Sequence, residues 1–261
     1  MNYSWIIPIG DAEAPQDINR CFNALQKILD PIDEVLIVRH LTDRELVDPL
    51  ISRLKCFITI VDHPETRTAA AARNAALQHC KYRKIIFQDV DDVPHLNRRE
   101  VIDRNLCSPG MIMTTGYESI IDGVKNGTRL PKPFNFIFYF RSNIFLPTAA
   151  IYLKDNHTIN FENLKVGEDT VFFARLLYEN YRVIYIRICT IDYHISTSKV
   201  LNKRGLKGVI NEIKYRRYLL LYSRSLIQRS MVVIGGVFFV ALKLLPVKIF
   251  KIFYNTGHTN E

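Results

Sequence analysis

Short apolar runs alternate with amphipathic stretches along the first ninety residues of the chain. The apolar runs are bounded by polar residues, which predicts buried strands at 3–9, 34–38, 57–61 and 84–88. Apolar residues between them recur at helical spacing, which predicts helices at 17–29, 43–54 and 68–80. Strand and helix therefore alternate, as is typical of an α/β domain with a mostly parallel sheet flanked by helices. In such sheets ligands bind in the crevice beyond the carboxyl ends of the strands.

The pattern is less regular in the middle of the chain. Residues 134–138 alternate like a strand, 144–153 are predicted to be extended, 168–179 helical and 183–188 a further strand. No internal repeat and no linker rich in Pro, Gly or Ser interrupts the first 200 residues. We therefore expect residues 1–198 to form one α/β domain and residues 199–261 to form a separate unit.

Composition places the chain among ordinary globular proteins. Its 261 residues are 48% hydrophobic and 23% charged, which suffices for a proper core. The five cysteines are widely spaced without a Cys-x-x-Cys pair, which predicts reduced thiols rather than a disulfide framework or a zinc motif. The first residues lack the basic and long apolar segments of a signal peptide. These features predict a cytoplasmic protein.

Positive charge is concentrated in the last quarter of the chain. Residues 199–261 hold twelve of the 35 Lys and Arg residues but only two of the 26 acidic ones, interleaved with Leu, Ile, Val and Phe. Thirteen uncharged residues separate Arg229 from Lys243, too few to span a bilayer comfortably. This predicts a basic amphipathic helical tail that lies peripherally on the inner face of the cell membrane. A hairpin packed on the core and a re-entrant segment are the alternatives.

Three carboxylates follow the fourth predicted strand: Asp89, Asp91 and Asp92. In extended backbone Asp89 and Asp91 would point to the same side, toward the crevice. Two carboxylates facing a crevice suit Mg²⁺ or Mn²⁺. A solvated acidic turn, with Asp92 capping the next segment, is the alternative.

Three further signals fall near the predicted crevice. Glu168 and Asp169 open an amphipathic helix, where acids either complement the helix dipole or supply a general base. Arg73 lies near the start of a helix that follows a strand, so it either binds a diphosphate or lies on the surface. His194 follows a predicted strand and either completes a metal site or serves as a structural histidine.

The order of these motifs resembles the family 2 glycosyltransferases, which have the GT-A fold. The resemblance is carried by Ser-Trp-Ile-Ile-Pro at 4–8, Ala-Arg-Asn at 72–74, Gln-Asp-Val-Asp-Asp at 88–92 and Glu-Asp-Thr-Val-Phe-Phe-Ala-Arg-Leu at 168–176. It covers about residues 3–198. It implies a GT-A-like fold and transfer of a sugar, with inversion, from a nucleotide diphosphate to a hydroxyl of a glycan or a lipid-linked acceptor. A UDP-sugar is the default donor.

The resemblance also implies roles for individual residues. Pro8, Arg73 and Asp89 would contact the nucleotide, while Asp91 would hold the metal. Asp169 would deprotonate the acceptor hydroxyl, and Glu168 would orient the acceptor or the base. Together with the candidate ligand His194, these are the predicted site residues.

The chain departs from the family pattern on the nucleotide side. Arg39 replaces an aspartate expected to contact uracil, Gly10 replaces an aromatic residue, and Thr68 and Ala76 replace glycines. A noncatalytic membrane-associated adaptor with the same fold is therefore the alternative function. Residues 10–16 lack the glycine-rich basic loop of a nucleotidyltransferase. Nucleic acid is not expected as a partner, because phosphate contacts do not require long apolar runs.

Overall fold

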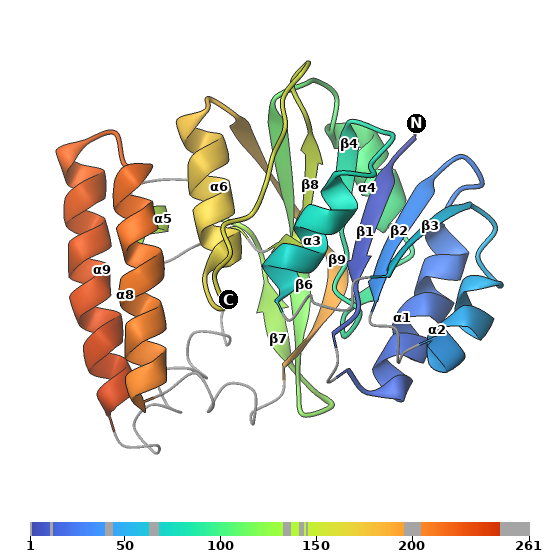
Figure 1. Cartoon of the computed structure of the whole chain (residues 1–261), viewed down its shortest axis with the longest axis horizontal. Coiled ribbons are helices and arrows are strands. Elements are labelled where there is room, and N and C mark those ends of the chain that lie inside the picture. The colour runs from blue at the N-terminus through green and yellow to red at the C-terminus, as the bar shows by residue number, and fades with distance from the viewer. Residues whose placement is uncertain are drawn as a thin grey trace.

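A single twisted sheet forms the centre of the molecule, with helices on both faces (Figure 1). The computed structural model describes residues 2–10, 13–39, 44–62, 68–132, 137–140, 144, 146–195 and 205–245. Within these residues the strand order is β3-β2-β1-β4-β8-β6-β9-β5, and β7 pairs with β6.

The N-terminal half of the sheet is parallel, as the sequence predicts. Its strands are β1 (Ser4–Pro8), β2 (Glu34–Arg39), β3 (Phe57–Asp62) and β4 (Lys84–Phe87). Its helices are α1 (Pro15–Ile28), α2 (Arg44–Ile51) and α3 (Ala69–Leu77). Side chains alternate between two cores: Ile6 packs on the α3 side and Trp5 on the α1 side. Burial on both faces explains the nearly continuous apolar runs of β1 and β2.

The C-terminal half of the sheet is mixed. Its strands are β5 (Val93–Pro94), β6 (Met111–Ile121), β7 (Val124–Arg129), β8 (Ala149–Tyr152) and β9 (Arg182–Ile195). Strand β8 is antiparallel to both β4 and β6, whereas β6 and β9 are parallel. Strand β9 is longer than predicted, so His194 lies within it rather than after it.

Short helical segments connect these strands: α4 (Arg98–Asn105), α5 (Ile137–Phe140), η2 (Leu146–Thr148) and α6 (Glu168–Tyr178). The strand predicted at 134–138 is wrong where it can be compared, because residues 137 and 138 belong to α5. Residues 134–136 lie outside the described residues. Phe138 and Tyr139 are both buried, so consecutive aromatic rings fill the core instead of alternating between two faces.

A helical hairpin ends the described chain. Helices α8 (Gly205–Leu221) and α9 (Leu226–Leu244) pack against each other, and α8 also packs against α6 (Figure 1). A capping box between Ser225 and Gln228 starts α9. Leu219 and Val232 belong to the same core cluster as Ile6 of β1. By length and composition alone, α9 is long and apolar enough to cross a membrane.

Candidate active site

A cleft of about 460 Å³ opens where β1 and β4 end and where α3 and α6 begin. Six predicted residues line it: Pro8, Arg73, Asp89, Asp91, Glu168 and Asp169. They come from four segments that lie far apart in the sequence. The carboxyl edge of the parallel strands is the place where α/β sheets bind ligands, so the fold brings the motifs together at the expected edge.

Asp89 and Asp91 lie on a turn rather than on extended backbone. The N–H of Asp92 donates to the carbonyl of Asp89 at 3.2 Å, which closes the turn. The extended conformation predicted for this segment is therefore wrong, although both side chains line the cleft. Arg20 Nη2 donates to the Asp91 carbonyl at 3.1 Å, and Gln88 Nε2 donates to the Asp89 carbonyl at 2.9 Å. These bonds hold the turn in one conformation.

The third carboxylate of the motif faces inward. Asp92 is fully buried, and its Oδ1 accepts a hydrogen bond from the backbone N–H of His194 at 2.9 Å. Burial and the charges of Asp91 and Asp89 raise the pKa of Asp92 well above its usual range. Asp92 therefore joins the turn to β9 instead of facing the cleft.

His194 is not among the described residues that line the cleft, whereas its neighbour Tyr193 is. Successive side chains of a strand point to opposite faces, so the His194 ring lies on the other face of β9. Burial and the charge of Arg20 on α1 lower the pKa of His194. The cleft lining thus includes Asp91 but not this predicted metal ligand.

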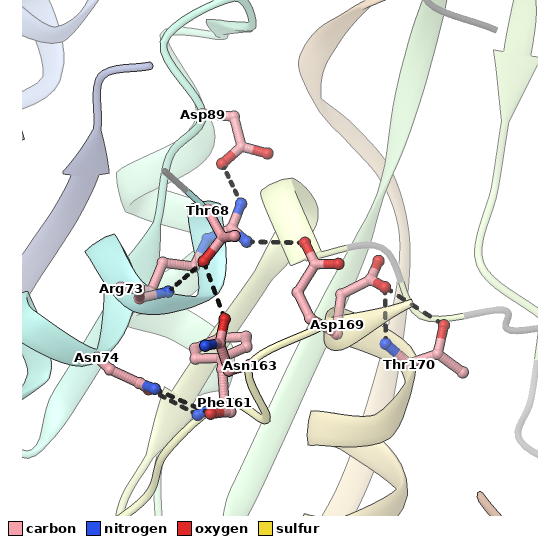
Figure 2. A network of polar contacts seen from close by, with 10 residues as sticks. Thr68, Arg73, Asn74, Asp89, Phe161, Asn163, Asp169 and Thr170 are labelled. Atoms are coloured by element: carbon pink, nitrogen blue, oxygen red, sulfur yellow. Dashed lines mark hydrogen bonds and ion pairs between the residues drawn. The ribbon is translucent and has the colours of Figure 1, made fainter. Parts of the chain in front are cut away.

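Arg73 connects the two acidic motifs (Figure 2). Its Nη2 lies 2.6 Å from Asp89 Oδ1 and its Nη1 lies 3.3 Å from Glu168 Oε1. The side chain is 5% exposed and its guanidinium stacks over the ring of Phe161. Burial disfavours the charged form, but the two carboxylates outweigh it and raise the pKa of Arg73. A permanent positive charge is therefore fixed between the β4 turn and the start of α6.

Asn74 fastens the segment that leads to α6 (Figure 2). Its amide donates to the carbonyl of Phe161 at 2.8 Å and accepts from the N–H of the same residue at 2.7 Å. Thr68 caps α3 through a bond from the Ala71 N–H and also donates to Asn163. In the Ala-Arg-Asn motif, the arginine therefore lines the cleft, and the asparagine holds in place the segment that leads to α6 on the opposite side of the cleft.

The acidic pair sits in the first turn of α6. Burial and the neighbouring charge of Asp169 raise the pKa of Glu168. Asp169 Oδ1 accepts a hydrogen bond from the Thr170 N–H at 2.7 Å. Before the pair, Gly167 has φ 78°, and a Cβ there would lie 2.7 Å from Cγ of Tyr215 on α8. Only glycine allows this approach, so the hairpin is in direct contact with the segment that carries both acids.

Residues 4–165 match the model of a known family, described as "Glycosyl transferase family 2". The chain belongs to glycosyltransferase family 2. The family resemblance, the GT-A-like α/β fold and the enzyme class, predicted from the sequence, are confirmed.

The chain is similar to several glycosyltransferases over most of its length. The amylovoran biosynthesis glycosyltransferase AmsE of Erwinia amylovora is 21% identical over 266 residues, covering 97% of both chains. TarS of S. aureus, solved with UDP-GlcNAc, is 17% identical with a TM-score of 0.65, covering 91% of this chain and 72% of that one. The mannosyltransferase PcManGT from Pyrobaculum calidifontis, solved with GDP-Man and Mn²⁺, is 14% identical with a TM-score of 0.54, covering 98% and 79%.

Among the cleft residues of this family 2 glycosyltransferase that the sequence patterns do not predict, three have ionisable side chains: Glu13, Lys165 and Tyr193. Lys165 lies two residues before Gly167, so its closeness in sequence to the Glu-Asp motif could have indicated that it lines the cleft. Tyr193 could be found only with the register of β9, because its strand was predicted to end at 188.

Arg39, which departs from the family pattern, has a structural environment of its own. The side chain is 5% exposed, and its Nε donates to Asp62 Oδ1 of β3 at 3.0 Å. It also forms an ion pair with Asp48 of α2. These contacts tie the ends of β2 and β3 to α2, so the guanidinium is engaged by carboxylates within the protein.

Proposed function

We propose that this glycosyltransferase moves a sugar from a nucleotide diphosphate sugar, by default a UDP-sugar, to a hydroxyl of a glycan or lipid-linked acceptor, with inversion. The observation that carries the proposal is the convergence of Arg73, Asp89, Asp91, Glu168 and Asp169 on one cleft. UDP-GlcNAc and GDP-Man in the solved structures of similar proteins support a nucleotide-sugar donor.

The donor would occupy the side of the cleft formed by β1, α3 and the β4 turn. Pro8 and Asp89 would contact the nucleoside, and the cations Arg73 and Lys165 would face its diphosphate. The carboxylate oxygens of Asp91 and Asp89 line the same cleft, and an oxygen donor set fits Mg²⁺ or Mn²⁺. Such a cation would neutralise charge on the leaving diphosphate. His194 stays a prediction as a further ligand.

Asp169 is the carboxylate that we assign as general base. Glu168 is held by Arg73, whereas Asp169 bonds to Thr170 within its own first turn and lines the cleft. The acceptor oxygen would bond to the anomeric carbon as its proton moves to Asp169. The carbon–oxygen bond to the diphosphate breaks in the same displacement, and its electron pair leaves with the diphosphate. A single displacement of this kind inverts the anomeric centre.

A thermal-shift panel of nucleotide diphosphates and their sugars, with and without Mn²⁺, tests this proposal. We expect one nucleotide to raise the Tm in a metal-dependent way. The shift should vanish in Asp91→Ala and persist in Asp155→Ala, an exposed aspartate outside the cleft. If no nucleotide shifts a folded, metal-supplied protein, the donor assignment fails and the noncatalytic adaptor becomes the better function.

We also propose that the α8–α9 hairpin lies on an anionic membrane surface. The outer face of α9 carries exposed apolar residues: Leu226, Ile227, Val233, Ile234, Val237, Phe238 and Leu244. Lys243 is turned inward, with Nζ 2.7 Å from Glu212 Oε2 of α8, so it leaves this face uncharged. The neighbouring helix α8 carries three exposed cations, Lys207, Lys214 and Arg217. An apolar face bordered by cations fits an interface with anionic headgroups.

A position in the interface fits the hairpin better than a transmembrane one. Helix α9 packs along α8, whose charged residues would have to enter the hydrocarbon if α9 crossed the bilayer. We therefore infer peripheral association on the cytoplasmic face, near a lipid-linked acceptor.

Cosedimentation with vesicles of anionic or neutral lipid tests this second proposal. The protein should bind the anionic vesicles, and Val237→Asp should abolish binding. Val124→Asp is the matched control, because Val124 is equally exposed but lies on β7. Equal binding of Val237→Asp and wild type would refute the assignment. Resistance to alkaline extraction would instead indicate a helix that spans the membrane.

A further inference from the structure

A second group of potential metal ligands lies on the face of β9 that points away from the cleft. One donor atom each from His95, Glu118 and Asp192 lies within 4.8 Å of the other two. His95 Nε2 is 2.7 Å from Asp192 Oδ1. The three side chains are 26%, 28% and 31% exposed, so they are sheltered but still reachable from solvent.

The register of β6 and β9 adds a thiol to this group. Glu118 pairs with Asp192 and Gly116 pairs with Cys189, so two steps on β6 match three on β9. This bulge brings Cys189 and Asp192 to the same face despite their odd spacing. A Cβ on Gly116 would lie 3.1 Å from Cys189 Sγ, so the glycine leaves room for the sulfur.

The imidazole belongs to His95, which directly follows the short strand β5. Val93 of β5 pairs with Asp192, and the N–H of His95 donates to the carbonyl of Thr190 at 2.8 Å. His95 is therefore fixed to β9 through its backbone as well as through its ring. The imidazole and the two carboxylates converge from three separate segments, and the Cys189 thiol lies one bulge away from Asp192 on β9, so no spacing motif in the sequence indicates the group.

The charges of the group favour a cation. Two carboxylates directly opposite each other on neighbouring strands repel. Lys125 Nζ lies 2.6 Å from Glu118 Oε2, but the lysine side chain is 60% exposed and can withdraw into solvent. Burial and the charges of Glu118 and Asp192 raise the pKa of Cys189, an effect that a bound divalent cation would reverse.

We propose that His95, Glu118, Cys189 and Asp192 form a zinc site that is separate from the donor-binding cleft. Zinc accepts nitrogen, sulfur and oxygen ligands in a tetrahedral arrangement, whereas Mg²⁺ and Mn²⁺ favour the all-oxygen set at Asp91. Ligand atoms around zinc lie about 3.4 Å apart, so the donor atoms of His95, Glu118 and Asp192 need to close by about 1 Å, and the Cys189 side chain has to turn toward them. Binding releases the thiol proton to solvent and displaces Lys125. The metal would pin β5 and the β6–β7 hairpin to β9.

Titration of the chelator-treated full chain with Zn²⁺, and separately with Co²⁺, tests the proposal. We expect one tight site per chain and, with Co²⁺, a tetrahedral visible spectrum with a thiolate charge-transfer band. Cys189→Ser should remove the charge-transfer band, and His95→Ala should weaken binding by at least about 10-fold. Asp91→Ala should leave the affinity unchanged, which separates this site from the cleft whether or not the donor proposal holds.

Lys125→Ala gives a test that does not remove any ligand. If Lys125 competes with the metal for Glu118, its removal should tighten Zn²⁺ binding. Zn²⁺ should also raise the Tm of the wild type but not that of Asp192→Asn. No stoichiometric binding at micromolar Zn²⁺, or a Co²⁺ spectrum that is unchanged in both Cys189→Ser and His95→Ala, would overturn the site.

Discussion

The cleft and the α8–α9 hairpin each bury an arginine beside a carboxylate, but the surroundings of the two arginines differ. Arg73 bridges Asp89 and Glu168 at the edge of an open cleft, where further acids face the same space. In the hairpin, the Glu212 carboxylate accepts hydrogen bonds from Arg216 Nε at 2.9 Å and from Lys243 Nζ at 2.7 Å, and all three side chains are nearly buried. The first set is arranged around a space for a ligand, and the second is closed on itself. Glu212 and Arg216 also line a cavity, of about 230 Å³, so a buried ion pair beside a cavity does not by itself indicate a binding site; the further acids that face the cleft distinguish it from the hairpin.

In the cleft, replacing the assigned base should have the largest effect on the rate of sugar transfer. Asp169→Asn should lower the transfer rate by about 10²–10⁴-fold, because proton abstraction is lost while the donor pocket is kept. The thermal shift caused by the donor should persist. Rate measurements beside Asp155→Asn check this, and transfer at the wild-type rate would exclude Asp169 as the base.

Breaking the closed network should give the largest effect on stability. Glu212→Gln leaves Arg216 and Lys243 buried without a carboxylate, so we expect a loss of about 3–5 kcal/mol in unfolding free energy. Glu100→Gln is the control, since its pair with Arg104 is exposed and should contribute at most about 1 kcal/mol. Urea denaturation measures both. Equal losses would mean that the buried network is no stronger than a surface pair.

The contact between the two regions should be sensitive to a single methyl group. Gly167→Ala places a Cβ against Tyr215 at a positive φ, so we expect a loss of about 1–3 kcal/mol together with reduced transfer activity. Gly123→Ala has a similar φ of 83° but meets nothing within 4 Å, which isolates the backbone strain. Identical behaviour of the two variants would show that the Tyr215 contact has no effect.

The smallest effect concerns the pH dependence of stability. Because the pKa of Glu168 is raised by burial and by Asp169, the folded chain keeps this proton to a higher pH than the unfolded chain. Wild-type stability should therefore fall as pH rises from the ordinary glutamate pKa to the raised one. The fall amounts to about 1.4 kcal/mol for each tenfold difference in proton affinity between the folded and unfolded chains, and Glu168→Gln should lack it. Matching pH profiles in urea titrations of wild type and variant would contradict it.

The sequence predicted the N-terminal half of the fold well because that half obeys simple patterns. Its parallel strands are buried on both faces, so apolar runs mark them directly. Strand β6 was missed because its polar residues are buried in pairs: Thr114 bonds to Thr148 at 3.0 Å and Thr115 to Thr190 at 2.5 Å. Hydroxyls that satisfy each other across strands give no hydrophobic signal.

The candidate site shows the same limit. The strand pattern predicts where the carboxyl edge of the sheet lies. The order of the motifs along the chain was therefore enough to predict that Asp89, Asp91 and the Glu-Asp pair share one cleft. It did not reveal the turn at Asp89–Asp92 or the side of β9 that carries His194. Those features depend on hydrogen bonds that the side chains of Arg20, Gln88 and Asp92 form with backbone groups, and these bonds arise from tertiary packing.

The packing of Tyr215 against Gly167 also limits where the chain can be cut into separate domains. A cut between residues 198 and 199 would remove the ring that packs against the segment just before Glu168 and Asp169. Transplanting the hairpin from a relative would likewise exchange a neighbour of the segment that carries Glu168 and Asp169, along with the outer apolar face. For protein engineering, the last helices and the start of α6 are one module, to be inherited or replaced together.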